Sequence, residues 1–115
     1  MIGRVAAAIA ARAAELTDLA STDQRVDPVE TITAELLPTC SALRFIARRG
    51  SGVLRTRAYN ALGRPAWLWG VRSRVYRKPR GKVLVLRTWN YPIFLPGVQA
   101  AQALAAGNSV LLKPA

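Results

Sequence analysis

The sequence has 115 residues, about the size of one domain, and 51% of them are hydrophobic. This share excludes an intrinsically disordered chain, and no apolar run is long enough to form a membrane-spanning helix. The 17 Lys and Arg residues against 6 Asp and Glu residues give a net charge of +11.

The charge is distributed unevenly along the chain. All six acidic residues lie before residue 36, and every charged residue after it is basic. An isolated domain with this charge would bind nucleic acid or another acidic surface. Alternatively, the chain is the opening part of a longer protein whose later segments supply acidic residues. There is no His and only one Cys, so the usual ligands of a metal cluster are missing and we expect no metal.

The N-terminal part of the sequence predicts helices. Hydrophobic residues at helical spacing predict one amphipathic helix over residues 3–19, and residues 21–25 predict a polar connector. Asp27 is placed to cap a second helix. We expect Pro38 to kink or split this helix, and residues 48–52 (Arg-Arg-Gly-Ser-Gly) to end it. We expect these helices to pack against the sheet of the last third of the chain.

The middle of the sequence predicts an arginine-rich connector followed by extended strands. The connector covers residues 53–65. Trp67-Leu68-Trp69 has strand character, and residues 71–77 alternate apolar and basic side chains with the period of a β-strand. Gly70 between them predicts a bulge or tight bend. Basic residues interleaved with aromatic ones also fit a nucleic-acid-binding surface, made here of Arg72, Arg74, Arg77, Lys78, Arg80, Trp67, Trp69 and Tyr76.

Residues 79–115 predict a βαβ unit. The apolar run from Val83 to Leu86 is typical of a strand covered on both faces. A helix is predicted over residues 95–106 and a second strand over residues 109–112. Gly107-Asn108 is expected to close the helix, because either residue can adopt the left-handed conformation. Two strands joined by a helix pair in parallel through a right-handed crossover.

Polar residues follow both predicted strands. Asn90 comes after the first strand and Lys113 at the end of the second. Ligands of parallel sheets bind outside the carboxyl ends of the strands. Two interpretations remain open from the spacing: Asn90 and Lys113 bind a ligand, or Asn90 caps the next helix and Lys113 is merely solvated.

Two motifs in this region are similar to those of the aldehyde dehydrogenase superfamily. They are Thr88-Trp89-Asn90-Tyr91-Pro92 and, farther on, Leu104-Ala105-Ala106-Gly107-Asn108-Ser109-Val110-Leu111-Leu112-Lys113-Pro114. The resemblance covers about the last third of the chain. It implies an α/β fold in which N-terminal helices and extended strands precede the first βαβ unit of a Rossmann-like cofactor domain. That cofactor domain would be truncated in this chain. Arg87 departs from this family, which usually has Gly at that position. The chain also lacks the dinucleotide-binding motif G-x-G-x-x-G, and this absence fits the family.

The resemblance also implies roles for individual residues. Asn90 would donate to the carbonyl oxygen of the substrate and stabilise the oxyanion formed when a cysteine thiolate attacks an aldehyde. Lys113 would contact the adenosine ribose of NAD or NADP. Thr88 and Trp89 would join Lys113 in the cofactor-binding region, with Trp89 as a wall of the pocket. The cysteine nucleophile and the glutamate base would lie downstream of residue 115.

The resemblance therefore predicts the N-terminal portion of an NAD(P)-dependent aldehyde dehydrogenase, which oxidises an aldehyde to a carboxylic acid through a cysteine thiohemiacetal. The 115 residues alone are expected to be inactive, and the full-length protein to be a homo-oligomer. Cys40 is expected to be a buried structural thiol, and a lone thiol suits the reducing cytoplasm. A non-catalytic, basic nucleic-acid-binding module and an inactive truncated product are the alternatives.

These expectations divide the chain into three parts. Residues 1–65 would form the N-terminal helical segment and connector, residues 66–78 the extended strands, and residues 79–115 the incomplete start of the NAD(P)-binding domain. We expect an aldehyde substrate, and neither a membrane nor nucleic acid as a partner.

Overall fold

The computed structural model describes residues 1–21, 27–60 and 63–114. Its elements are, in chain order, α1 (Ile2–Ala11), α2 (Ala13–Ala20), α3 (Pro28–Thr31), the π-helical turn η1 (Ile32–Leu36), α4 (Leu37–Leu54), β1 (Arg57–Tyr59), the 3-10 turn η2 (Ala66–Leu68), β2 (Ser73–Val75), β3 (Lys82–Leu86), α5 (Phe94–Ala105) and β4 (Ser109–Lys113). No helix among these described residues is long and apolar enough to cross a membrane.

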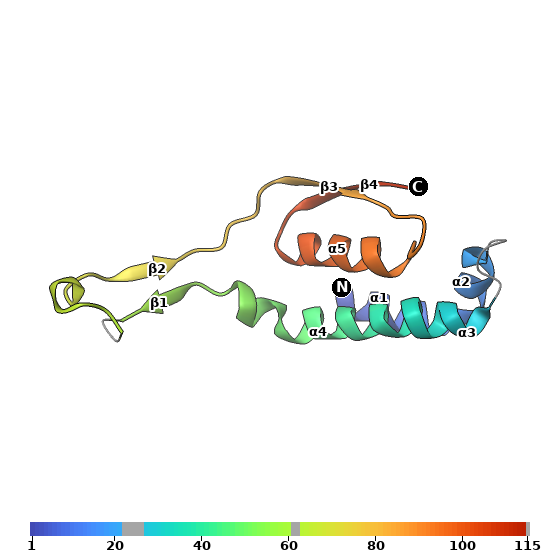
Figure 1. Ribbon diagram of the computed structural model, residues 1–115, viewed down its shortest axis with the longest axis horizontal. Helices are drawn as coiled ribbons and strands as arrows, with labels where there is room; N and C mark the ends of the chain where they lie inside the picture. The colour runs from blue at the N-terminus through green and yellow to red at the C-terminus, as the bar shows by residue number, and fades with distance from the viewer. Residues whose placement is uncertain (22–26, 61–62, 115) are drawn as a thin grey trace.

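The elements form a layered body and a long arm, which gives the molecule dimensions of 64 × 25 × 23 Å (Figure 1). In the body, α4 contacts α1 and α5, and α5 in turn contacts β3 and β4. The N-terminal helices therefore pack on α5, which separates them from the sheet. Our expectation that they would pack on the sheet itself is wrong, because α5 already covers that face.

The βαβ unit is confirmed. β3 and β4 pair in parallel with Lys82 opposite Ser109 and Leu86 opposite Lys113. Only one face of this sheet is covered: Val85, which faces α5, is 4% exposed, whereas Leu84 and Leu111 on the other face are 58% and 68% exposed. The expectation of strands covered on both faces is therefore not met within this chain.

The N-terminal helices differ from the sequence prediction at two points. The single helix predicted over residues 3–19 is broken at Arg12, whose φ of −111° and ψ of 27° are not helical. The predicted end at residues 48–52 is wrong, because α4 continues through both glycines to Leu54. The contacts that α4 makes with α1 and α5 hold the helix as a whole, and each glycine costs it only about 1 kcal/mol relative to alanine. The predicted connector at 21–25 lies outside the described residues except for Ser21.

The second helix begins as predicted. The Asp27 Oδ1 atom accepts a hydrogen bond from the Val29 amide at 2.8 Å, so Asp27 is the N-cap. The interruption expected at Pro38 takes the form of η1, the π-helical turn that directly precedes it. Proline lacks an N–H and its ring clashes with the carbonyl four residues earlier, and a wider turn relieves both conflicts without ending the helix.

The buried core lies between α1, α4 and α5. Ala6, Leu43 and Ala101 are its buried members, and Ile2, Ile9 and Ile46 pack against them. Alanines at this contact allow the helix backbones to approach closely. Cys40 is also buried here, and its thiol lies 3.4 Å from the Ala6 carbonyl oxygen. The expectation that Cys40 is buried is confirmed, and its structural role stays a prediction.

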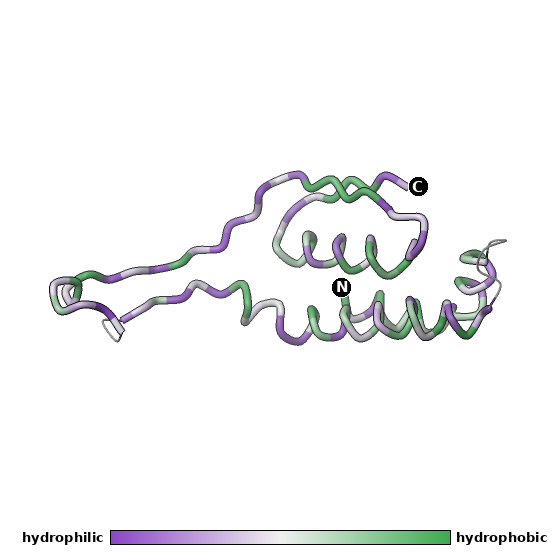
Figure 2. Tube along the Cα trace, in the orientation of Figure 1, coloured by the Kyte–Doolittle hydropathy of each residue, from purple (hydrophilic) through white to green (hydrophobic). Residues whose placement is uncertain are grey.

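The arm is an antiparallel hairpin of β1 and β2, with Arg57 opposite Val75. Figure 2 shows hydrophilic and hydrophobic residues mixed along it. The strand predicted at Trp67-Leu68-Trp69 is wrong, since residues 66–68 form a 3-10 turn at the tip. β1 was not predicted, because three residues without an apolar alternation carry no strand signal.

Candidate active site

The two strands of the βαβ unit end side by side at the same edge of the sheet. Leu86 is paired with Lys113, and the Arg87 amide donates to the Lys113 carbonyl oxygen at 3.0 Å. The loop of residues 88–92 leaves the sheet directly after this contact. The resemblance motifs are thus brought together at the carboxyl edge of β3 and β4, where parallel sheets bind ligands.

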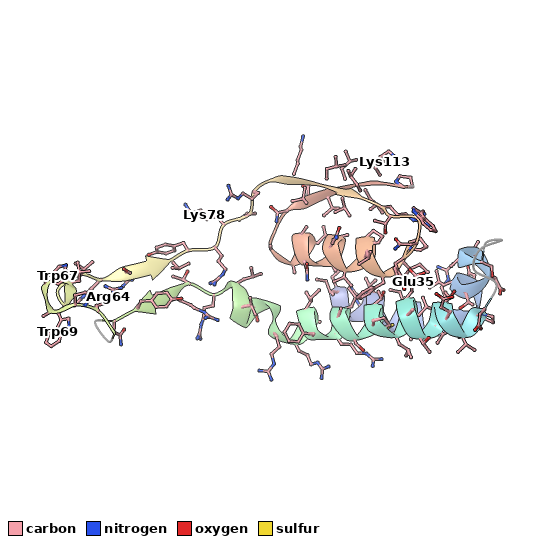
Figure 3. The ribbon with its side chains drawn as sticks, viewed as in Figure 1. Glu35, Arg64, Trp67, Trp69, Lys78 and Lys113 are labelled. Carbon is pink, nitrogen blue, oxygen red and sulfur yellow. The ribbon has the colours of Figure 1, made fainter. Side chains whose placement is uncertain are left out.

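Lys113 lies at this edge on the open face of the sheet. Paired residues of parallel strands point to the same face, so Lys113 shares the face of Leu86 rather than the face covered by α5. Its side chain is exposed, and its ammonium donates to the adjacent Pro114 carbonyl oxygen at 3.1 Å (Figure 3). A flexible cation in this place is able to reach a ligand at the strand ends.

The loop between β3 and α5 presents polar and aromatic side chains to the surface. Thr88 and Asn90 are exposed, and Trp89 is 76% exposed. The N-cap position of α5 is Ile93, so Asn90 is not the helix cap that the second interpretation of the sequence required. Asn90 instead lies three residues before the cap, in the loop.

Glu35 holds the start of α5, a role that the sequence reasoning missed. Its Oε2 atom accepts hydrogen bonds from the amides of Ile93 at 2.6 Å and Phe94 at 3.0 Å. The side chain comes from η1 and is completely buried against the first turn of α5 (Figure 3). A buried acid must be paired or hydrogen-bonded, and helix N-termini supply unsatisfied amides and a favourable dipole.

A sequence signal for Glu35 existed in its spacing. Thr31, Glu35 and Thr39 recur every four residues, and each is at most 1% exposed. They form a polar stripe within the buried face of one continuous helical segment. Periodicity reasoning looks for apolar stripes, so it assigned Glu35 only to the acidic half of the chain.

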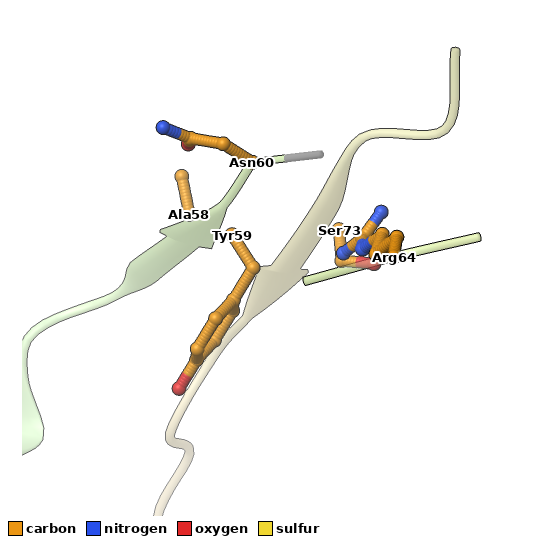
Figure 4. A pocket seen from close by; sticks show the side chains of 5 residues that line it. All are labelled: Ala58, Tyr59, Asn60, Arg64 and Ser73. Atoms are coloured by element: carbon orange, nitrogen blue, oxygen red, sulfur yellow. The ribbon is translucent and has the colours of Figure 1, made fainter. Parts of the chain in front are cut away.

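The hollows in the described part of the surface include one in the arm and one beside the N-terminal helices. One is in the arm, lined by Ala58, Tyr59, Asn60, Arg64 and Ser73 (Figure 4). The Arg64 guanidinium there donates to the Val71 carbonyl oxygen at 2.6 Å, and the lining has no carboxylate or thiol. The other is an apolar groove between α1, α4 and α5. Neither lining includes Asn90 or Lys113, which lie at the open edge of the sheet and in its loop.

The fold and this edge define an α/β segment with an exposed, polar loop at the carboxyl ends of parallel strands. The chain belongs to the aldehyde dehydrogenase family, whose sequence model matches residues 1–115. This confirms the family resemblance seen in the two motifs.

Several curated proteins are similar to the chain. The 4,4'-diapolycopene aldehyde oxidase of Methylomonas sp. is 36% identical over 85 residues, which are 74% of this chain and 16% of that protein. The benzaldehyde dehydrogenase YfmT of Bacillus subtilis (strain 168) is 46% identical over 50 residues, 44% of this chain and 10% of that protein. The vanillin dehydrogenase of Corynebacterium glutamicum is 48% identical over 46 residues, 40% of this chain and 10% of that protein.

The matched region spans only about a sixth of the length of the first of these relatives. No solved structure matches the chain significantly. The family is therefore shown by sequence.

Proposed function

We propose that the chain is the N-terminal portion of an NAD(P)-dependent aldehyde dehydrogenase that oxidises an aldehyde to a carboxylic acid through a cysteine thiohemiacetal. The observation that carries the proposal is the family match over residues 1–115, together with Asn90 in an exposed loop at the carboxyl edge of the parallel strands. Residues 79–115 would begin the cofactor domain, after a helical segment at 1–65 and extended strands at 66–78.

In the proposed reaction, a thiolate supplied by the downstream polypeptide attacks the carbonyl carbon of the aldehyde, and the carbonyl electron pair moves to oxygen. The Asn90 carboxamide N–H donates to that oxygen. Its hydrogen bond strengthens as negative charge develops, which lowers the barrier by about 3–4 kcal/mol when such a donor is pre-positioned. NAD or NADP would supply a hydride acceptor for this oxidation, and Lys113, Thr88 and Trp89 are the residues of this chain that would hold it.

The residues at the sheet edge fit an adenosine ribose. The Lys113 ammonium is exposed and is bonded to the carbonyl oxygen of its neighbour Pro114, so a ribose hydroxyl or a phosphate oxygen is able to replace that partner. The exposed indole of Trp89 and the Thr88 hydroxyl would form the adjacent wall. Thr88 and Trp89 belong to the loop that follows β3, and Lys113 ends the neighbouring strand β4.

The uncovered face of the sheet supports the view that further polypeptide completes this domain. Leu84, Leu86 and Leu111 expose 58%, 61% and 68% of their surfaces on that face. Doubly wound sheets have about five or six strands with helices on both faces, whereas the described residues supply this sheet with the strands β3 and β4 and cover one face with α5. We also propose that the full-length protein is a homo-oligomeric, cytoplasmic enzyme.

The experiment is a fusion in which residues 1–115 replace the corresponding segment of the Bacillus subtilis benzaldehyde dehydrogenase, assayed with benzaldehyde and NAD or NADP. We expect Asn90→Ala to lower kcat by about 100-fold or more. Lys113→Ala should instead raise KM for the cofactor. Asn60→Ala, an exposed asparagine of the arm, is the matched control. Undiminished turnover in Asn90→Ala would refute the oxyanion role.

The 115-residue chain alone should reduce no cofactor with any aldehyde, because it lacks the nucleophile and the base. Turnover that persists through repurification, and that scales with the amount of this chain, would contradict the proposal. The measurement is the absorbance of the reduced nicotinamide.

The arm favours one alternative, a non-catalytic nucleic-acid-binding module. Trp67 and Trp69 at its tip are 82% and 65% exposed, and the chain from residue 36 onward contains no acidic residue (Figure 3). Exposed aromatics with cations suit stacking on single-stranded bases. Binding of a single-stranded oligonucleotide at two salt concentrations tests this: a steep salt slope, together with a loss of affinity in Trp67→Ala/Trp69→Ala, would favour the module over the enzyme.

A further inference from the structure

The loop that carries Asn90 is anchored at both of its ends. At its start, the Arg87 amide donates to the Lys113 carbonyl oxygen at 3.0 Å. At its end, the amides of Ile93 and Phe94 donate to the Glu35 carboxylate at 2.6 and 3.0 Å. The first anchor belongs to the parallel ladder. The second is a side chain that is 58 residues away in the sequence.

The second anchor is close to Asn90 along the chain. Only Tyr91 and Pro92 separate Asn90 from the anchored Ile93 amide. Proline fixes its own φ near −65° and restricts the residue before it to extended conformations, so few torsions remain free between Asn90 and the anchor. Whatever fixes the Ile93 amide therefore fixes the path of the chain at Asn90.

The anchor is of a rigid kind. Glu35 is 0% exposed and comes from the helical segment that continues into α4, which packs against both α1 and α5. Charge-assisted hydrogen bonds from backbone amides to a carboxylate are shorter and stronger than those between neutral groups. The same carboxylate also complements the positive end of the α5 dipole. A neutral or shorter side chain at this position would leave the two amides buried with a weaker acceptor or none.

We infer that Glu35 is a positioning residue, which fixes the Asn90 carboxamide where the substrate oxyanion forms by anchoring the end of the loop. This inference rests on the proposed oxyanion role of Asn90. Because Glu35 is 0% exposed, it would act through the loop rather than through contact with substrate or cofactor. A donor that is misplaced by about 1 Å can lose about 100-fold in rate. The Glu35 anchor therefore links the packing of the N-terminal helices to the chemistry at the sheet edge.

The first test uses the 15N-labelled 115-residue chain. Glu35→Gln keeps the volume of the side chain and removes its charge, and Glu30→Gln, an exposed glutamate just before it, is the matched control. We expect Glu35→Gln to shift the amide proton signals of Ile93 and Phe94 upfield and to broaden or split the side-chain amide signals of Asn90. An unchanged Asn90 spectrum beside shifted Ile93 and Phe94 signals would overturn the inference.

The second test is a double-mutant cycle in the fusion enzyme, with kcat expressed per titrated active site so that misfolded protein is not counted. Glu35→Gln should lower kcat about tenfold or more with KM for the cofactor unchanged, whereas Glu30→Gln should leave both unchanged. If Glu35 acts through Asn90, Glu35→Gln/Asn90→Ala should be no slower than Asn90→Ala alone.

The outcomes separate the two ideas. If Asn90→Ala is as fast as the unaltered fusion, the proposed function of Asn90 fails. If Asn90→Ala is slow but the two losses multiply in the double variant, Asn90 keeps its role and the inference about Glu35 is overturned. If the fusion yields no titratable active sites, the spectra of the 115-residue chain decide the inference on their own.

Discussion

The Asn108 side chain joins the beginning of β4 to the segment that leads into β3. Its Oδ1 atom accepts from the Arg80 amide at 2.6 Å and from the Gly81 amide at 3.0 Å, and its Nδ2 donates to the Ala103 carbonyl oxygen at 3.0 Å. One side chain therefore connects both strands of the βαβ unit to the last turn of α5. The sequence predicted that Gly107-Asn108 closes the helix through a residue in the left-handed conformation, and that residue is Gly107, whose φ is +84°.

Replacing this side chain should destabilise the βαβ unit. Asn108→Ala removes three hydrogen bonds, and we expect the free energy of unfolding to fall by about 1–3 kcal/mol, at about 0.5–1.5 kcal/mol a bond with partial exposure of the site. Chemical denaturation monitored by circular dichroism measures this. Asn60→Ala in the arm, for which we expect a change within about 0.5 kcal/mol, is the control. Equal stabilities of the two variants would contradict the connecting role.

Gly107 should tolerate no side chain without a cost in backbone energy. Its φ is +84°, and an added Cβ would meet Pro79 only at an ordinary contact distance of 3.6 Å. We therefore expect Gly107→Ala to lower the free energy of unfolding by about 1–2 kcal/mol through strain in the left-handed conformation rather than through a clash.

The matched control is Gly52→Ala. Gly52 lies inside α4 with nothing within 4 Å of an added Cβ, so alanine should stabilise the helix by about 0.5–1 kcal/mol. Denaturant midpoints of the two variants should move in opposite directions. A shift of the same sign in both would contradict this assignment of the two glycines.

Cys40 should be unreactive in the folded chain. Its thiol is buried between α4 and α1, next to the Ala6 carbonyl oxygen. We expect an aromatic disulfide reagent to label Cys40 only at the rate of unfolding, and Cys40→Ala to keep the turnover of the fusion enzyme. Rapid labelling without denaturant, or loss of turnover in folded Cys40→Ala protein, would indicate a chemical role for this thiol.

The ion pair of Arg12 and Glu15 should make the start of α2 sensitive to pH. The Arg12 Nε donates to the Glu15 carboxylate at 2.7 Å, and this hydrogen bond lowers the pKa of Glu15 below its ordinary value of 4.5. A lowered folded-state pKa means that the contribution to stability is present above the ordinary value. It is lost as the pH falls from there through the lowered value.

We expect Arg12→Gln to return the pKa of Glu15 towards its ordinary value, as measured by a carboxyl carbon NMR titration. High salt should reduce the difference between the two proteins, because both side chains are exposed and the interaction is screened. An identical Glu15 titration in the two proteins would show that the pair does not persist in solution.

The arm illustrates where local patterns fail. The apolar and basic alternation at residues 71–77 predicted a strand, and Ser73–Val75 within it is one, but its partner Arg57–Tyr59 was assigned to a connector. Trp67 and Trp69 favour strands by residue type, yet they lie at the turn of the hairpin, which requires a compact backbone. The pairing of β1 with β2, two segments about 15 residues apart, makes Arg57–Tyr59 a strand and places the tryptophans in the connection between the strands.

The sequence by itself determined the strand–helix–strand order of residues 82–113, the Asp27 cap and the family, because each depends on residues within a few positions of one another. Only the tertiary structure decided which groups hold the candidate site. The Glu35 carboxylate accepts a hydrogen bond from the Ile93 amide, 58 residues away in the sequence. The side-chain oxygen of Asn108 accepts one from the Arg80 amide, 28 residues away. Such partners become neighbours only when the helices pack, because a buried polar group must find its hydrogen bonds wherever the fold places donors and acceptors.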